Sequence, residues 1–295
     1  MLGQREIAPH GLGGQERLRL NPKVCIRRVG AQRGQRKGWL AANPAQPCKV
    51  ERQARPDAGE ERLTLPSKEQ LAALLRAAEA GPEPERDIAA IRILMFSGLR
   101  ISELLGLPDG MVAAGGATAT IKIRERLDRK YAVLGRVKSS KARRDVPVGP
   151  AATRAVKSWR MRRGPVKGFV HKDLAGTAHH VSGRLFPAPN GGDLWTYDAF
   201  IRDCWIPLLE RAGLLDRVKD RKGKVRPVLA FYPHVLRHVA ASLWIEQGLQ
   251  PKKVQELLGH ATLSMTMDLY GHLWRDNDED EALALESERL ITSGK

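Results

Sequence analysis

The chain has 295 residues, of which 42% are hydrophobic, enough for one large domain or two ordinary ones with a proper core. Its formal charge of +17 and pI of about 10.2 favour a polyanionic partner, with nucleic acid first and an anionic membrane second. No apolar run approaches the roughly 18–20 residues that span a bilayer, and no signal-peptide core is present. Cys25, Cys48 and Cys204 are widely spaced, which argues against a zinc site and indicates a reducing compartment.

The N-terminal part of the chain differs in composition from the rest. Residues 1–38 are rich in Gly, Gln and Arg, contain no aromatic residue and show no sustained hydrophobic period. Residues 38–47 are typical of the end of a short helix, and residues 48–66 form a polar linker broken by Pro and Gly. We therefore expect a basic N-terminal region and linker over 1–62 and one folded domain over 63–295.

Local signals predict a domain that is mainly helical. Ser67 with Gln70 three residues later forms a capping box, which predicts a helix over 68–80. Residues 117–149 change to strand-like runs joined by charged turns, which predicts a small three-stranded antiparallel sheet. The mixture makes the expected fold class α+β. Further helices are expected at 84–97, 99–107, 151–162, about 197–212, 233–247 and 251–258.

Two motifs place arginine beside a possible partner. In "SGLRISELLGL", Gly98 lets the backbone turn before Arg100, and Glu103 lies one helical turn later, where it can hold the guanidinium. The alternative is an ordinary surface salt bridge. In "YPHVLRHVAASLW", His234 and Arg237 are neighbours on one helix face, a pair suited to proton transfer and anion binding. The alternative is an amphipathic helix with a polar edge.

Two C-terminal motifs add a histidine and a tyrosine. His260 follows a helix-ending glycine, where it can donate to a phosphate oxygen or cap the preceding helix. In "SMTMDLYGHLW", Tyr270 lies on one helix face with Leu263, Met267 and Trp274, so it is either a core aromatic or a nucleophile. If it is a nucleophile, we expect the three apolar side chains to anchor the helix while the tyrosine faces a cleft.

The segment "GRVKSSKARRDVPV" is a basic hairpin. One interpretation is a solvated charge run or a nonspecific phosphate contact. The sharper interpretation makes one lysine a proton donor to a leaving oxygen. The basic side chains concerned are Lys138, Lys141, Arg143 and Arg144.

Taken together, these motifs resemble the tyrosine recombinase family of phage integrases and Xer-type recombinases, over about residues 63–290. The matches are "GLRISELLGL", "HVLRH" and "LGHATLSMTMDLY". The resemblance implies the tyrosine recombinase catalytic fold, with a ring of side chains around the scissile phosphate and Tyr270 as the nucleophile. Glu103 would hold the first arginine, and His238 matches a frequent family position without an assigned step. The implied catalytic set is Arg100, Lys138, His234, Arg237, His260 and Tyr270, with Lys141 a weaker candidate for the lysine and Lys141, Arg143 and Arg144 as DNA contacts.

The resemblance also implies a reaction and partners. The enzyme would cleave and rejoin double-stranded DNA at attachment sites through a 3′-phosphotyrosyl intermediate, without a metal or other cofactor. It would act in bacterial cytoplasm, associated with the nucleoid, as part of a mobile genetic element. The acidic tail, with Leu283, Leu285 and Leu290, has an amphipathic pattern and would dock on a neighbouring protomer of a tetramer, or alternatively on its own chain.

One part of the family pattern is missing from the sequence. Family members carry an N-terminal helical domain that closes around DNA, and only "GWLAANP" resembles its end. We therefore expect a truncated or replaced N-terminal region. We also expect this chain to cleave DNA or bind it weakly, and do not expect it to recombine DNA efficiently. Two alternatives stay open: a decayed integrase that binds DNA without turnover, and a type IB topoisomerase-like enzyme.

Overall fold

A computed structural model describes part of the expected catalytic domain. Residues 1–62, Lys138 and all but one residue of the acidic tail lie outside the described part, so the predictions that concern them stay predictions. No helix among the described residues has both the length and the apolar composition needed to cross a membrane. The described residues are 65–129, 132–137, 140–172, 176–189, 194–219, 225–274 and 289.

Capping signals and glycines place the first helices as expected. Helix α2 spans Lys68–Glu79, and the predicted capping box joins Ser67 to Gln70 by two hydrogen bonds of 2.9 and 3.2 Å. Helix α3 spans Pro84–Ser97 and ends at Gly98, whose φ of 60° is left-handed. The short helix α4 follows at Ile101–Leu105.

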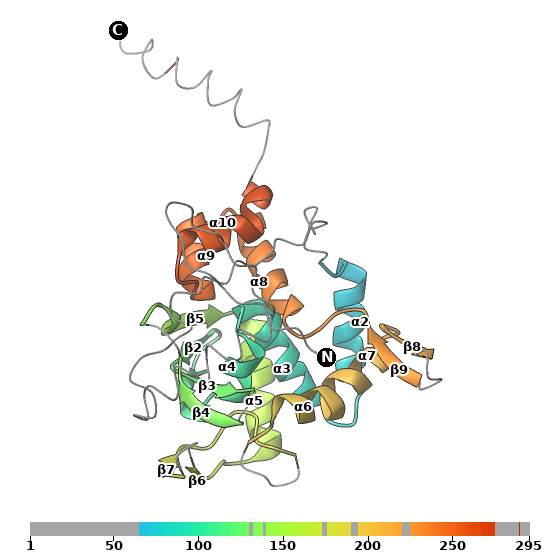
Figure 1. Cartoon of the computed structure of the whole chain (residues 1–295), viewed down its shortest axis with the longest axis vertical. Coiled ribbons are helices and arrows are strands. Elements are labelled where there is room, and N and C mark those ends of the chain that lie inside the picture. The colour runs from blue at the N-terminus through green and yellow to red at the C-terminus, as the bar shows by residue number, and fades with distance from the viewer. Residues whose placement is uncertain are drawn as a thin grey trace, which may run out of the picture. The chain divides into compact units, whose positions relative to one another are not determined.

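The later helices also match the predicted ranges, with one difference. The helix expected at about 197–212 contains a π-helical turn at Ile201–Trp205 just before Pro207, which has no N–H to continue the α-helical ladder. A 3₁₀ turn at Gly271–Trp274 follows α10, which is labelled in Figure 1. The helices are α5 (Pro150–Arg163), α6 (Tyr197–Phe200), α7 (Ile206–Arg211), α8 (Val235–Glu246), α9 (Pro251–Leu258) and α10 (Leu263–Tyr270).

The predicted three-stranded antiparallel sheet is present, but one of its strands differs from the expectation. Its order is β1–β2–β5, with β1 at Val112–Ala113, β2 at Ala119–Ile123 and β5 at Arg144–Val148. Buried and exposed side chains alternate along β5, as expected for a strand with one face on the core. The middle run of the predicted sheet instead forms a separate hairpin, β3 (Glu125–Asp128) with β4 (Val133–Arg136). The local pattern indicates strands but does not say which strands pair.

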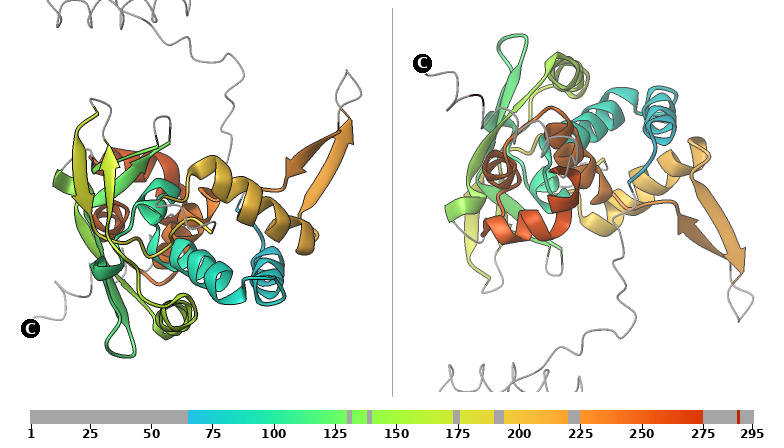
Figure 2. Two further views of the ribbon diagram at one scale, coloured as in Figure 1. Left: turned by 90° about the horizontal axis from the view of Figure 1, so that it is seen from below. Right: turned by 90° about the horizontal axis from the view of Figure 1, so that it is seen from above.

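Two more hairpins were not predicted. They are β6 (Phe169–Lys172) with β7 (Ala178–Val181), and β8 (Leu215–Lys219) with β9 (Val225–Leu229). Figure 2 shows β8 and β9 projecting away from the helices of this domain, and nearly all of their side chains are exposed. Without a buried face, these strands lack the alternating hydrophobic pattern that would identify them.

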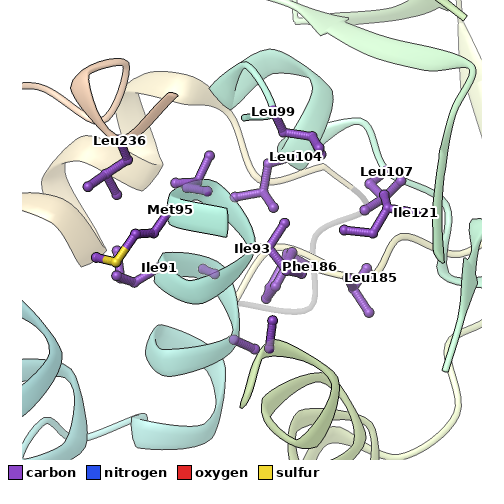
Figure 3. Close-up of a cluster of buried hydrophobic side chains, with 14 of the residues drawn as sticks. Ile91, Ile93, Met95, Leu99, Leu104, Leu107, Ile121, Leu185, Phe186 and Leu236 are labelled. Carbon is purple, nitrogen blue, oxygen red and sulfur yellow. The ribbon is translucent and has the colours of Figure 1, made fainter. Parts of the chain in front are cut away.

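The core is built around α3, which packs against α2, α5 and α8. Figure 3 shows Ile93 of α3 beside Phe186, with Leu104 of α4 and Leu236 of α8 in the same cluster. These side chains are almost completely buried, and burial of each stabilises the fold by about 1.5–3 kcal/mol. The cluster therefore fixes the end of α3, the start of α4 and the first turn of α8, which carry the polar residues described next.

Candidate active site

Arg237 is a buried cation that connects three helices. It lies on α8 with 2% of its surface exposed. Its Nη1 donates to the carbonyl of Gly98 at the end of α3 (2.6 Å), and its Nη2 donates to the carbonyl of Leu258 at the end of α9 (2.7 Å). Helix C-termini leave such carbonyls unpaired and carry partial negative charge. The two helix ends therefore fix the guanidinium in position. Burial, followed by the charge of Arg100, lowers the pKa of Arg237 to about 9, so it is still a cation at neutral pH.

Glu103 holds two arginines at once. Its carboxylate accepts from Arg144 at 3.1 and 2.8 Å, and it also accepts from the backbone N–H and Nη1 of Arg100 at 2.9 and 3.1 Å. Burial alone would raise the pKa of Glu103, but the hydrogen bonds and charge of Arg144, with the charges of Arg100 and Arg237, lower it to about 2. The predicted contact between Glu103 and Arg100 is therefore present, and Glu103 is ionised at neutral pH. We call Arg100, Glu103, Arg144 and Arg237 the arginine frame.

Arg144 does not fit its predicted role as a DNA contact. It is 8% exposed, and besides Glu103 it donates to the carbonyls of Leu257 (2.6 Å) and Ala142 (3.2 Å). A guanidinium committed in this way is a support for Glu103 and not a free surface charge. The other two residues of the predicted DNA contact, Lys141 and Arg143, are exposed, and Lys141 donates to the carbonyl of Ala261 at 2.9 Å.

Tyr270 is buried, with 1% of its surface exposed, so it lies deeper than the predicted cleft edge. Its hydroxyl lies 2.6 Å from Nδ1 of His238. Burial raises the pKa of Tyr270 to about 12, and the nearby charges of Arg237 and Arg100 oppose that rise. The phenol therefore stays protonated at neutral pH, beside cations that are placed to favour its anion.

His260 is held from both sides. It is 5% exposed, its Nδ1 lies 3.0 Å from Oγ1 of Thr266, and its carbonyl accepts from Nε2 of Gln255 at 3.1 Å. Burial, followed by the charges of Arg237 and Arg100, lowers the pKa of His260 to about 4, so the ring is neutral at pH 7. These contacts fix its orientation and the position of the loop between α9 and α10.

His234 immediately precedes α8 and is exposed. Its ring meets that of His238 edge to face, with centroids 5.1 Å apart. Loss of water around the ring, followed by the charges of Arg237 and Arg100, lowers the pKa of His234. The structure thus brings together five of the six predicted catalytic residues, while Lys138 lies outside its described part.

Helix α10 is oriented differently from the prediction. Leu263 and Met267, two of the expected anchors, are 41% and 40% exposed. The buried side chains of α10 are Thr266 and Tyr270, which lie four residues apart on one face. Trp274 is half-buried, and its Nε1 donates to the carbonyl of Leu249 at 3.1 Å, so this anchor is present.

Thr266 and His238 are site residues to which sequence reasoning assigned no role. Both occupy positions of the quoted motifs, "LGHATLSMTMDLY" and "HVLRH". The spacing of four between Thr266 and Tyr270 was the available signal, because it places both on one helix face.

A pocket of about 320 Å³ opens beside the arginine frame. It is lined by Arg100 and Glu103 of the frame, and by groups from β3, the 3₁₀ turn before β5 and the loop after α9. Fixed cations next to an opening of this kind suit an anionic phosphate whose charge grows during reaction. Its remaining lining residues are Ser102, Arg126, Val137, Ala142, Gly259, Ala261 and Met265.

Comparison with solved structures defines the class of fold. The Tn1549 transposon integrase in complex with transposon right end DNA superposes with a TM-score of 0.61 at 21% identity, covering 91% of this chain and 85% of that one. The XerH site-specific recombinase bound to difH gives 0.51 at 23% identity, covering 75% and 53%. The fold is therefore that of the catalytic part of these recombinases.

Sequence comparison then gives the family. The model of the phage integrase family matches residues 66–276. The tyrosine recombinase XerC of Xylella fastidiosa strain M23 is 26% identical over 268 residues, covering 89% of this chain and 74% of the relative. XerD of Caulobacter vibrioides is 28% identical over 265 residues, covering 86% and 72%. This chain belongs to the phage integrase family of tyrosine recombinases, enzymes that cleave and rejoin DNA, and neither alternative function is favoured.

Proposed function

We propose that Tyr270 is the nucleophile of a site-specific DNA recombinase and forms a 3′-phosphotyrosyl bond with one strand. The observation that carries this assignment is the burial of Tyr270 with its hydroxyl against His238 and near Arg237 and Arg100, the two cations whose charges oppose the rise of its pKa. A tyrosine that only packed in the core would not need a cluster of cations around its hydroxyl.

The other predicted residues take complementary roles in this proposal. Arg100, Arg237 and His260 donate to the non-bridging phosphate oxygens, where charge grows in the transition state. His234 adds a donor at the open side of the site. A lysine protonates the departing 5′-oxygen, and Lys138 remains the first candidate with Lys141 second. Because the phosphotyrosyl bond conserves the energy of the phosphodiester, rejoining requires no nucleotide cofactor.

We propose double-stranded DNA with attachment sites as the substrate. The recombinases named above, Tn1549 integrase and XerH, were solved bound to DNA, and the charge of +17 suits a polyanion. Lys141 and Arg143 are exposed on either side of Ala142, which lines the pocket, and would contact phosphates. A protein of this class would work in the cytoplasm, at the nucleoid.

Assembly on DNA would use the C-terminal tail. Within the expected catalytic domain 63–295, helix α10 and the turn after it expose five apolar side chains, which we call the α10 apolar surface. The amphipathic tail of a neighbouring protomer in a tetramer offers leucines that match such a surface. The α10 apolar surface comprises Leu263, Met265, Met267, Leu269 and Leu273.

The experiment that tests the nucleophile uses a nicked attachment-site duplex that traps the cleaved strand. Wild-type protein is expected to form a covalent protein–DNA adduct, and Tyr270→Phe is expected to form none while it still binds the duplex. Tyr232→Phe is the matched control, because Tyr232 is 58% exposed and should leave the adduct unchanged. Salt-sensitive binding without any wild-type adduct would refute the catalytic proposal.

A further inference from the structure

The hydroxyl of Tyr270 has one hydrogen-bond partner among the described residues, and that partner is His238. The Tyr270 oxygen and His238 Nδ1 are 2.6 Å apart, with ring centroids 5.7 Å apart. His238 lies one position after Arg237 on α8, between Leu236 and Val239, which are buried in the main core, so the imidazole is carried by a rigid element. The nucleophile on α10 therefore meets a specific nitrogen on a different helix.

This geometry distinguishes the roles of the two neighbouring histidines, His234 and His238. His234, which the sequence pairs with Arg237 as a residue suited to proton transfer, lies edge-on to His238 at a centroid distance of 5.1 Å. It is the ring of His238, and not that of His234, that makes the hydrogen bond with the phenol. With the hydrogen of His238 on Nε2, its Nδ1 has a free lone pair directed at the hydroxyl.

We propose that His238 is the general base of strand cleavage and accepts the hydroxyl proton of Tyr270 at Nδ1. This inference rests on the proposed function. In the forward step the Tyr270 oxygen forms a bond to phosphorus and the bond from phosphorus to the 5′-oxygen breaks. The phenolic proton passes to His238, and the 5′-oxygen takes a proton from a separate acid. In rejoining, His238 returns its proton to the departing tyrosine.

The surroundings of His238 explain why the step would wait for DNA. The ring faces His234 just before α8, Arg237 of α8 and Tyr270 of α10, and its charge also acts on His260 in the loop after α9. Burial, followed by the charges of His234 and Arg237, lowers its pKa to about 4. Proton transfer from a phenol to this base is therefore unfavourable in the free protein. A phosphate bound by the arginines supplies the negative charge that offsets the imidazolium, and so promotes transfer.

The test measures single-turnover cleavage of the nicked duplex by three variants of the full chain. His238→Asn keeps a hydrogen-bond acceptor near the position of Nδ1 but cannot take up a proton at neutral pH. His238→Ala removes the acceptor altogether. His272→Asn is the matched control, because His272 is exposed two residues after Tyr270 and has no role in the site.

We expect both His238 variants to bind the duplex as wild type does and to cleave at least about 100-fold more slowly at pH 7. Their rates should rise roughly tenfold per pH unit, because hydroxide then removes the tyrosine proton, whereas the wild-type rate levels off. A bridging 5′-sulfur, which leaves without a proton, should not rescue either variant. Cleavage by His238→Asn at the wild-type rate would overturn the proposal and leave His238 as a positioning residue.

A second measurement does not depend on activity or on the variants of His238. Nitrogen NMR of labelled histidine in the DNA-free protein should show a neutral His238 with its proton on Nε2, and the Nδ1 signal should move in Tyr270→Phe. A proton on Nδ1 would overturn the proposal. Failure of wild-type protein to form any adduct would instead refute the proposed function, so the two failures are distinguishable.

Discussion

The arginine frame and helix α10 are built on opposite principles. In the frame, Glu103, Arg144 and Arg237 are all at least nine-tenths buried, and their charged groups bond to one another or to helix-end carbonyls. Helix α10 buries only Thr266 and Tyr270 and exposes much of its apolar surface. Residues next to the frame in the chain, Leu99, Leu104 and Leu236, belong to the main core, whereas Tyr270 of α10 belongs to a smaller cluster with residues of α8 and α9.

This difference teaches how such a site can be rigid and movable at once. Separating the charged groups of the frame would leave buried charges without partners, which is energetically costly. The phosphate-binding part therefore keeps its shape. Among the described residues, three side-chain hydrogen bonds join α10 and the turn after it to other elements: Thr266 to His260, Tyr270 to His238 and Trp274 to Leu249. Each contributes about 0.5–1.5 kcal/mol. The nucleophile can therefore be repositioned at much lower cost than the groups that bind the phosphate.

The contrast between the frame and α10 would be wrong if the frame stayed stable without the charge of Glu103. Glu103→Gln keeps the shape of the side chain but leaves Arg144 buried without its counter-ion. We expect the free energy of unfolding to fall by about 3–5 kcal/mol, measured by urea denaturation. Glu69→Gln, at an exposed carboxylate of α2, is the control and should change little. A loss of less than about 1 kcal/mol is what an exposed ion pair contributes, and would mean that Glu103 is not a buried ionic centre.

The next effect concerns the pH dependence of the free energy of unfolding, through His260 in the loop between α9 and α10. His260 has a pKa of about 4 in the fold against an ordinary 6.5, so the unfolded chain takes up a proton first. Its stabilising contribution is complete above pH 6.5 and is lost as pH falls to 4, in total about 3 kcal/mol.

Unfolding measured from pH 7 to 4 should show this slope in wild type and a smaller one in His260→Asn. His180→Asn, at an exposed histidine of β7, should keep the wild-type slope. Equal slopes in all three proteins would contradict the assignment.

A smaller effect tests the inner face of α10. Thr266 is fully buried, and Thr266→Val keeps its volume while leaving Nδ1 of His260 without a partner. We expect a loss of about 1–2 kcal/mol in the free energy of unfolding. Cleavage should slow by roughly tenfold, because the orientation of His260 is no longer fixed. Ser264→Ala, on the exposed side of the same helix, should change neither quantity. An unchanged cleavage rate in Thr266→Val would show that His260 does not need this partner.

Sequence reasoning succeeded where the determining interactions are local. The capping box at Ser67 and the left-handed glycines Gly98 and Gly259 are signals within a few residues, and the helix ends follow them. Strand pairing depends on distant partners, so the sheet was correct in type and size but one strand was misassigned. The prediction that Arg144 contacts DNA was wrong for the same reason, because its partner Glu103 lies 41 residues away in the chain.

The candidate site was predictable as a set, although not as an arrangement. The order of Arg100, His234, Arg237, His260 and Tyr270 in the chain was enough to bring them together as a hypothesis. The partner of Tyr270, in contrast, depends on how α10 rotates against α8. The apolar period of Leu263, Met267 and Tyr270 suggested a buried stripe, yet nothing in the period tells whether another element covers each position.

The smallest effect on folding is expected on the outer face of α10. Leu269 is 40% exposed and directly precedes the buried Tyr270, so Leu269→Ser should change the free energy of unfolding by about 0.5 kcal/mol or less. If the α10 apolar surface receives the tail of a neighbouring protomer, the same variant should still bind a single site but assemble less on paired sites. Light scattering of the protein–DNA complexes measures this assembly. Unfolding cost above 2 kcal/mol would show that Leu269 packs within its own chain. Normal assembly with a negligible change in the free energy of unfolding would show that protomers do not meet at Leu269. The difference between buried and exposed side chains of α10 would then serve only to place Tyr270.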